Sequence, residues 1–301
     1  MNFQNEFSWS KSRDELFNEC KRKYYFKHYG CWGGWDQTAP ERIKELYILK
    51  NLSTRHIWIG GVVHQIIKYY LIQLKAGNHV ILSNLLFKLK NKLKEDYDGS
   101  EAGTYKKFPK KCGLVEHEYK YLIPKDEWDG LFKTAENCIT NFYNSDILKE
   151  IKKEDISKWL FLEDFLYFNF EGTKVYLSID FAIKNGDNQI ILYDWKTGKE
   201  RDVEMDIQLA CYALYVIQKW NLDPSRLIIK KYNVAIDKED KFEITDKTIE
   251  YIKDYMRKSI EDMKNILADK EKNIANEEDF LKTTNVKNCL RCNFKKTCDL
   301  V

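Results

Sequence analysis

The sequence predicts a mixed α/β fold whose N-terminal half is helical. Up to about residue 150 the hydrophobic residues recur every three or four positions, whereas three segments between residues 159 and 196 alternate with a period of two. The composition is typical of an ordinary globular chain, with 44% hydrophobic residues, 4 prolines and 13 glycines among 301 residues. We therefore expect a mixed sheet flanked by helices.

Four helices are expected in the first half of the chain. The first covers residues 10–29, where Leu16, Phe17, Cys20 and Tyr24 are spaced at helical intervals. The others cover residues 60–74, 80–97 and 126–150. The clearest of them opens at Gly60-Gly61 and carries a single apolar stripe, formed by Val63, Ile66, Ile67, Tyr70, Leu71 and Leu74.

Strands and a hairpin are expected next. Trp159–Asn169, Val175–Lys184 and Gln189–Lys196 are rich in aromatic and branched residues, and the Asn185-Gly186 pair is a strong hairpin signal. Within the second strand, alternation predicts one apolar face, formed by Leu177, Ile179, Phe181 and Ile183. The remaining chain is expected to form a helix over residues 203–219, strands over 226–235 and 241–244, and a long charged helix up to about residue 273.

Charge and hydropathy limit the classes of protein. The net charge of +3, from 50 basic and 47 acidic residues, does not by itself identify a nucleic-acid partner. Residues 1–13 show no secretory signal, and polar residues interrupt the apolar stretch 57–74 well short of the roughly 18 apolar residues of a membrane span. We expect a cytoplasmic protein without a membrane span, whose 8 cysteines are thiols or metal ligands rather than disulfides.

Two aspartates and a lysine are predicted to meet on the hairpin. Alternation puts Asp194 and Lys196 on one face, and the short turn brings Asp180 within cross-strand reach of Asp194. Two acids so close repel unless a cation lies between them, and Mg²⁺ takes carboxylate oxygens together with water and phosphate. Lys196 could hold an attacking water or offset charge on a phosphoryl group. On its own, the Asp194-Trp195-Lys196 triplet is better explained as an exposed ion pair on a strand.

Four other polar residues stand out from apolar surroundings. His64 lies at the edge of the helical stripe, and Glu163 is a carboxylate in an otherwise apolar strand. Gln208 and Tyr212 are one helical turn apart and suited to contacting a substrate backbone. Taken singly, a core histidine and an amphipathic helix rim are plainer explanations.

In this order, these residues resemble the PD-(D/E)xK nuclease superfamily, specifically its RecB-like exonuclease branch. That branch shows a helix histidine, an acid, a strand aspartate, Asp-x-Lys with Thr-Gly, and then Gln-x-x-x-Tyr. The matching residues here are His64, Glu163, Asp180, Asp194 with Lys196 and Thr197-Gly198, and Gln208 with Tyr212. Relatives carry Gly-Arg-Ile-Asp-Arg around the strand aspartate, where this chain has Leu177-Ser178-Ile179-Asp180-Phe181.

Three cysteines near the C-terminus predict a metal site. Cys289, Cys292 and Cys298 form a C-x2-C-x5-C run, and three thiols so close normally share a metal. The segment around Cys20 resembles the cysteine motif of RecB-like nucleases with an iron–sulfur staple, including the AddB subunit and CRISPR-adaptation exonucleases, which implies Cys20 as the fourth ligand. Cys31 is a rival. Four thiolates suit a 4Fe-4S cluster or a zinc ion, and only the resemblance favours iron.

The resemblance implies a restriction-endonuclease-like core and a divalent-metal-dependent DNA exonuclease that acts on single-stranded DNA or DNA ends. The implied metal is Mg²⁺ or Mn²⁺, and a histidine among the ligands suits Mn²⁺ better. Glu163 is implied as an auxiliary acid at the rim of the site. The implied catalytic residues are Asp180, Asp194, Lys196 and Glu163, the metal ligands are His64, Asp180, Asp194 and the Trp195 carbonyl, and the DNA contacts are Gln208 and Tyr212.

The resemblance runs nearly end to end, so we expect residues 1–301 to form a single nuclease domain. Residues 1–155 would be its mainly helical part with His64, 156–246 its sheet core and active site, and 247–301 its C-terminal helix and cysteine motif. DNA repair, recombination or CRISPR adaptation is the implied setting, with CRISPR-adaptation proteins or a helicase as candidate partners. The alternative is a non-catalytic DNA-end-binding subunit of a larger repair or CRISPR complex with a structural metal site.

Overall fold

Six strands form one mixed sheet in the computed structural model, which describes residues 4–198 and 207–298. On one edge of β3, β2 runs antiparallel along its length; on the other edge, β4 pairs at residues 181–184 and β1 pairs at residues 174–175. Parallel β5 and antiparallel β6 extend the sheet from β4. The strands are β1 Ser8–Trp9, β2 Trp159–Phe170, β3 Thr173–Lys184, β4 Ile190–Lys196, β5 Leu227–Asn233 and β6 Lys238–Glu243.

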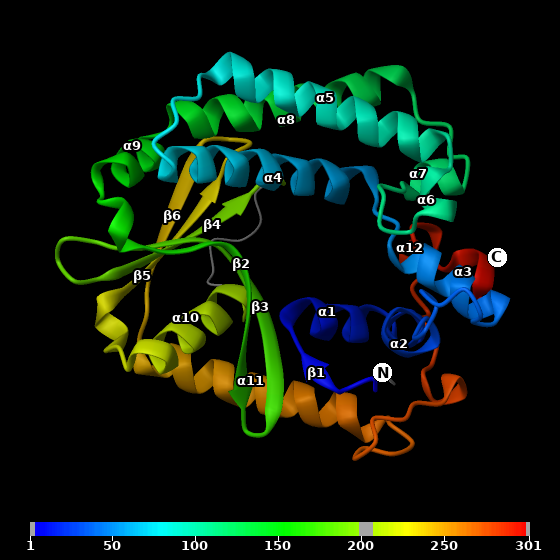
Figure 1. The fold of residues 1–301 in the computed structure, drawn as a ribbon. Helices are drawn as coiled ribbons and strands as arrows, with labels where there is room; N and C mark the ends of the chain where they lie inside the picture. The colour runs from blue at the N-terminus through cyan, green and yellow to red at the C-terminus, as the bar shows by residue number, and fades with distance from the viewer. Residues whose placement is uncertain (1–3, 199–206, 299–301) are drawn as a thin grey trace.

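Helices lie on both sides of this sheet, which confirms the predicted fold class (Figure 1). The α-helices are α1 Lys11–Glu19, α2 Lys21–Tyr25, α3 Glu41–Lys50, α4 Arg55–Lys75, α5 Leu82–Glu101, α6 Thr104–Lys107, α7 Val115–Glu118, α8 Lys125–Asn144, α9 Asp146–Lys153, α10 Ile207–Trp220, α11 Asp246–Asn265 and α12 Val286–Leu290. A π-helix, η1, covers Phe26–Gly30, and 3-10 turns are η2 Ile156–Lys158, η3 Pro224–Arg226, η4 Glu277–Asp279 and η5 Lys295–Thr297.

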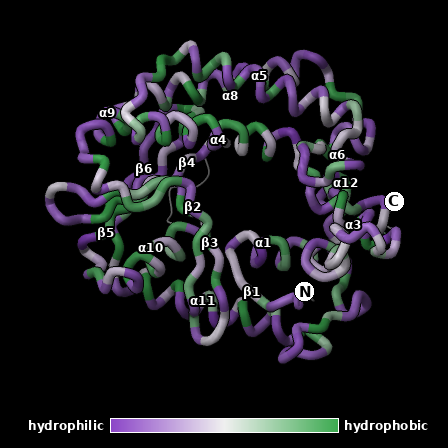
Figure 2. The backbone as a smooth tube through the Cα atoms, in the orientation of Figure 1, coloured by the Kyte–Doolittle hydropathy of each residue, from purple (hydrophilic) through white to green (hydrophobic). Residues whose placement is uncertain are grey.

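The hydrophobic core is divided among three clusters. One joins α1, α10 and α11 to one side of the sheet, and a second joins α4, α5, α8 and α9 to the other side. The third packs η1 and α3 against Phe294, so it brings the N-terminal and C-terminal parts of the chain together. Figure 2 shows many hydrophobic residues along α4, while the outer helix α5 is more hydrophilic.

The β2–β3 hairpin turns its face midway, which the sequence pattern did not predict. Leu177 and Ile179 pack in the cluster of α1, α10 and α11, whereas Phe181 and Ile183 pack in the cluster of α4 and α8. The expectation of one continuous apolar face was therefore wrong. The change occurs at Asp180, and Figure 1 shows the hairpin bending away from β4 toward β1.

Several element boundaries also differ from the sequence prediction. The helix over 10–29 is interrupted at Cys20, whose φ of −165° is extended and whose sulfur caps α2. The helix over 126–150 divides at Ser145, which caps α9. The last long helix ends at Asn265 rather than near 273, and the residues beyond it form a turn in which Asp269 accepts backbone hydrogen bonds from Glu271 and Lys272. Helix α3 was missed, and residues 203–206 of the predicted helix before Lys219 lie outside the described residues.

None of the helices within residues 4–198 and 207–298 combines the length and apolarity needed to cross a bilayer.

A buried carboxylate links α1 to α11. Asp14 is 1% exposed, and its oxygens accept hydrogen bonds from Ser259 Oγ and Tyr255 Oη, each at 2.6 Å. Asn18 Nδ2 donates to it as well, at 3.1 Å. Because buried polar groups cost free energy when they lose their partners, this carboxylate holds two elements that are more than 200 positions apart in sequence.

We predict that Asp14→Ala lowers the free energy of unfolding by about 2–4 kcal/mol, because the hydroxyl groups of Ser259 and Tyr255 lose their acceptor inside the protein. Urea denaturation followed by circular dichroism measures this change. Glu15→Ala is the matched control, since Glu15 is the next residue and its side chain is 65% exposed. Equal destabilisation by both variants would contradict the role assigned to Asp14.

Candidate functional site

The β3–β4 register places two aspartates opposite each other. Phe181 pairs with Tyr193, so Asp180 and Asp194 occupy the next opposing positions, where Cβ atoms are typically about 5 Å apart. Asp180 Oδ2 accepts a hydrogen bond from the Trp195 backbone N–H at 2.7 Å. Both carboxylates are buried, with exposed fractions of 7% and 1%. The cross-strand proximity expected from the hairpin is therefore present.

Helix α4 and strand β2 add an imidazole and a third carboxylate. His64 Nδ1 lies 3.3 Å from Glu163 Oε1 and 3.4 Å from Asp180 Oδ1. One potential ligand atom from each of these residues lies within 4.8 Å of the others. Ligands about 2.2 Å from one small ion lie no more than about 4.4 Å apart, and both distances from His64 Nδ1 are below this limit, so the cluster is close to the dimensions of a divalent-cation site. Glu163 thus lies within the cluster rather than at its rim.

Glu163 reaches this position through an unusual backbone conformation. Its φ is +52°, in the left-handed region that costs a non-glycine residue free energy. Lys68 of α4 donates a hydrogen bond from Nζ to the Glu163 carbonyl oxygen at 3.1 Å. Lys68 was not predicted as a site residue, although its spacing of one helical turn from His64 was a readable signal.

A glycine lets α4 approach the end of β4. A Cβ atom on Gly60 would lie 2.8 Å from Thr197 Oγ1. Gly60 therefore does not open the helix, as the sequence suggested, but lies inside it, because α4 begins at Arg55. This close packing brings His64, one turn further along, toward the carboxylates.

Lys196 joins the second aspartate to α10. Its Nζ lies 2.8 Å from Asp194 Oδ2 and donates to Gln208 Oε1 at 3.1 Å. Gln208 Nε2 in turn donates to the Tyr212 hydroxyl. The structure thus places Gln208 and Tyr212 next to Lys196. Asp194 forms an ion pair with Lys196 and does not belong to the cluster of His64, Glu163 and Asp180.

The charges in the cluster favour a cation. Burial alone would lower the pKa of His64, but the charges and hydrogen bonds of Asp180 and Glu163 raise it to about 10. Burial, with the Asp180 charge, raises the pKa of Glu163 despite the opposing effects of His64 and Lys68. Oxygen ligands with one imidazole suit Mg²⁺ or Mn²⁺, so the residues present fit a divalent ion.

Four cysteines line one small pocket at the other end of the molecule. Cys20 from the start of α2 lies there with Cys289, Cys292 and Cys298. Two of the sulfur atoms accept backbone hydrogen bonds, Cys20 Sγ from Lys23 N–H and Cys292 Sγ from Phe294 N–H. The rival Cys31 does not line this pocket; it is buried in the adjoining cluster with Phe294, and its thiol donates to the Lys27 carbonyl at 3.1 Å.

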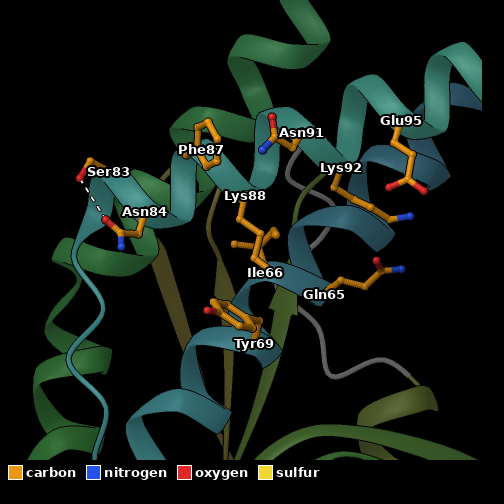
Figure 3. Close-up of a pocket in the computed structure, with 10 residues that line it drawn as sticks. All are labelled: Gln65, Ile66, Tyr69, Ser83, Asn84, Phe87, Lys88, Asn91, Lys92 and Glu95. Carbon is orange, nitrogen blue, oxygen red and sulfur yellow. Dashed lines mark hydrogen bonds between the residues drawn. The ribbon is translucent and has the colours of Figure 1, made fainter.

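Two larger hollows lie near the candidate metal site. One, of about 800 Å³, lies between α4 and α5 and includes Tyr69, Phe87 and Lys92 (Figure 3). Glu95 is the only acid among its lining residues, so it lacks a cluster of potential metal ligands. A second groove of about 800 Å³ adjoins Gln208 and extends along β3.

The sequence matches the family model described as the PD-(D/E)XK nuclease superfamily over residues 8–299. The chain belongs to this superfamily. Membership supports a nuclease function with DNA as substrate, and divalent metal ions are typical of these nucleases.

Other comparisons add little to the superfamily assignment. No curated protein is similar enough to match the chain. Among solved structures, the chain is similar to one described as "Crystal structure of SSO0001", with 16% identity, a TM-score of 0.30, and coverage of 61% of this chain and 78% of that chain. A likeness this weak carries no argument about this nuclease.

We predict that Mn²⁺ binds to this nuclease and that Glu163→Gln weakens the affinity at least about tenfold, because a charged ligand becomes neutral. Isothermal titration calorimetry measures the dissociation constant without any need for catalysis. Asp164→Asn is the control, since the neighbouring Asp164 is exposed and outside the cluster. Unchanged affinity in Glu163→Gln would remove Glu163 from the metal site.

Proposed function

We propose that this nuclease is a divalent-metal-dependent DNA exonuclease that hydrolyses phosphodiester bonds in single-stranded DNA or at DNA ends. The observation that carries the proposal is the cluster of His64, Glu163 and Asp180 beside the Asp194–Lys196 pair. The ordered resemblance to the RecB-like branch supports exonuclease action, and it also motivates a role in DNA repair or CRISPR adaptation.

Some side chains of the site would bind the metal ion, and others would contact or position the substrate. A bound Mg²⁺ or Mn²⁺ would polarise the scissile phosphate and lower the pKa of a bound water. Asp180, Glu163 and His64 would supply its protein ligands, and Asp194 with the Trp195 carbonyl would complete the set. Asp180 is held in place by the Trp195 N–H.

Lys196 is suited to positioning the attacking water. Its ammonium is fixed from two sides, by Asp194 Oδ2 and Gln208 Oε1, while its side chain remains 34% exposed. A fixed cation at this position offsets negative charge that develops on the phosphoryl oxygens. Gln208 and Tyr212, linked to it, would contact the DNA backbone.

We further propose that the four cysteines hold a structural 4Fe-4S cluster. Zinc bound by thiolates at about 2.3 Å keeps the sulfur atoms about 3.8 Å apart. Among the described residues, no three of these thiols have all their sulfur atoms within 4.8 Å of one another. The wider arrangement of the sulfur atoms favours iron over zinc, while the N–H···S hydrogen bonds suit thiolates bound to either metal.

We predict that the protein cleaves labelled single-stranded DNA in the presence of Mn²⁺ and that Asp194→Asn lowers the rate at least about 100-fold, because Lys196 loses its charged partner. Gel electrophoresis over time distinguishes terminal from internal cleavage. Asp187→Asn, in the exposed β3–β4 turn, is the control and should cleave as fast as the wild type.

Metal-dependent cleavage that is the same in wild type and Asp194→Asn would contradict the proposed site. Binding of DNA ends by the wild type without any metal-stimulated cleavage would instead favour a non-catalytic subunit of a larger complex.

We predict that anaerobically purified protein is brown, with visible absorbance that Cys20→Ser removes and Cys31→Ser retains. Cys20 lines the common pocket and Cys31 does not, so only the first substitution removes a proposed ligand. Absorbance spectra and metal analysis measure the outcome. A colourless wild-type protein with stoichiometric zinc would overturn the iron assignment.

A further inference from the structure

Large aromatic side chains lie exposed on the β2–β3 hairpin. Phe165 is 74% exposed and Tyr167 is 63% exposed, although aromatic residues of this size are usually buried. The Phe165 ring is stacked on Tyr176, with 5.1 Å between ring centroids and an interplanar angle of 13°. The Tyr167 ring lies beside the same tyrosine, with 6.0 Å between ring centroids. Exposure of such a stack to water is unfavourable unless a ligand covers it.

This aromatic stack is continuous with the metal cluster. Tyr176 and Asp180 are four residues apart on β3, which limits their separation to about 14 Å in an extended strand. The groove that adjoins Gln208 is lined in one part by Phe165, Tyr176 and Ser178. Another part is lined by Gln208 and Tyr212. Since Gln208 accepts a hydrogen bond from Lys196, one groove joins the aromatic stack to the proposed catalytic lysine.

The edge of β3 along this groove carries no strand partner. β4 pairs with β3 up to Phe181, and β1 pairs with it only at residues 174 and 175. Between these points, residues 176–180 have no strand on that edge within the described chain. The lower part of the hairpin and the start of α1 lie on either side of this gap in the pairing (Figure 1).

Positive charge accompanies the aromatic rings. Arg13 and Lys27 line the same groove. Lys11 lines it as well, so three basic residues stand against the two acids Glu6 and Glu15. Aromatic faces beside cations suit a ligand with planar apolar groups joined by an anionic backbone.

We propose that Phe165 and Tyr176 form a base-stacking platform for single-stranded DNA, which guides the strand along the groove to the metal cluster. This inference rests on the proposed nuclease function. A single strand presents free base faces to such a platform, whereas base faces within a duplex are already stacked on one another. The platform would therefore select single-stranded over double-stranded substrate.

The platform predicts a specific loss of single-strand affinity. Stacking on one aromatic side chain is worth roughly 5-fold to 100-fold in affinity per base. Fluorescence anisotropy with a fluorescein-labelled 15-nucleotide oligo-dT, with Ca²⁺ in place of Mn²⁺ to suppress cleavage, measures it. We expect Phe165→Ala to weaken binding by that factor, Phe165→Leu to weaken it similarly, and Phe165→Trp to retain it, because only tryptophan preserves an aromatic face.

Three controls separate stacking from other causes. Phe87→Ala removes a similarly exposed phenylalanine, 68% exposed, from the hollow between α4 and α5, and should bind oligo-dT as the wild type does (Figure 3). Affinity for a blunt duplex of the same length should be unchanged in Phe165→Ala. With Mn²⁺, hydrolysis of thymidine 5′-(p-nitrophenyl) phosphate should also be unchanged, because this small ester lacks the neighbouring nucleotides that would occupy the platform.

The outcomes distinguish the two proposals. If the wild type cleaves single-stranded DNA but Phe165→Ala and Tyr176→Ala bind oligo-dT as tightly as the wild type, the platform is wrong and the nuclease assignment stands. If the wild type hydrolyses neither DNA nor the ester, yet Phe165→Ala still loses oligo-dT affinity selectively, the platform stands and the proposed catalysis fails. Equal losses for oligo-dT, duplex and ester in Phe165→Ala would indicate misfolding and overturn the platform.

Discussion

The hydrogen bond from the Trp195 N–H to Asp180 fixes the position of Asp180 and the point at which β3 separates from β4. The β3–β4 ladder ends at the Phe181–Tyr193 pair, and at the next step a carboxylate accepts the backbone hydrogen bond. Because a side chain completes this bond, β3 is free to leave β4 and bend toward β1. The bend places Asp180 at the junction of two layers, where α4 can reach it. A continuous flat ladder would leave no space for His64 and Glu163 beside the two aspartates.

The cysteine pocket is the second feature on which the fold depends. It joins the start of α2 to the last residues of the described chain, and Tyr119 and Asn293 add hydrogen bonds between the halves. Figure 1 shows α12 beside α3, across the molecule from the sheet. A cluster bound here would close nearly the whole chain into one loop and remove conformational freedom from the unfolded state. The groove between α1 and β3 lies between this pocket and the Trp195–Asp180 hydrogen bond.

The sequence allowed prediction where periodicity and local spacing decide the structure. The hairpin itself followed from Asn185-Gly186, but its register did not. A two-residue turn there would pair Lys184 with Asp187, whereas Lys184 pairs with Ile190, and this longer turn is what brings Asp180 opposite Asp194. Periodicity alone did not reveal the reversal of face at Asp180, because the left-handed Glu163 interrupts a regular strand and depends on Lys68 from a distant helix. Likewise, Cys20 and Cys31 are indistinguishable by spacing, and only packing puts one of them beside the C-terminal thiols.

Charge balance explains why these groups gather in one place. Asp180, Asp194 and Glu163 bring three carboxylates, against the ammonium groups of Lys68 and Lys196. The imidazolium of His64 balances the remaining negative charge, which is why the acids raise the pKa of that ring so far. A phosphodiester would gain little from a neutral cluster. A divalent ion held by Asp180, Glu163 and a neutral His64 would leave the site with a net positive charge, which would favour an anionic DNA backbone near Lys196.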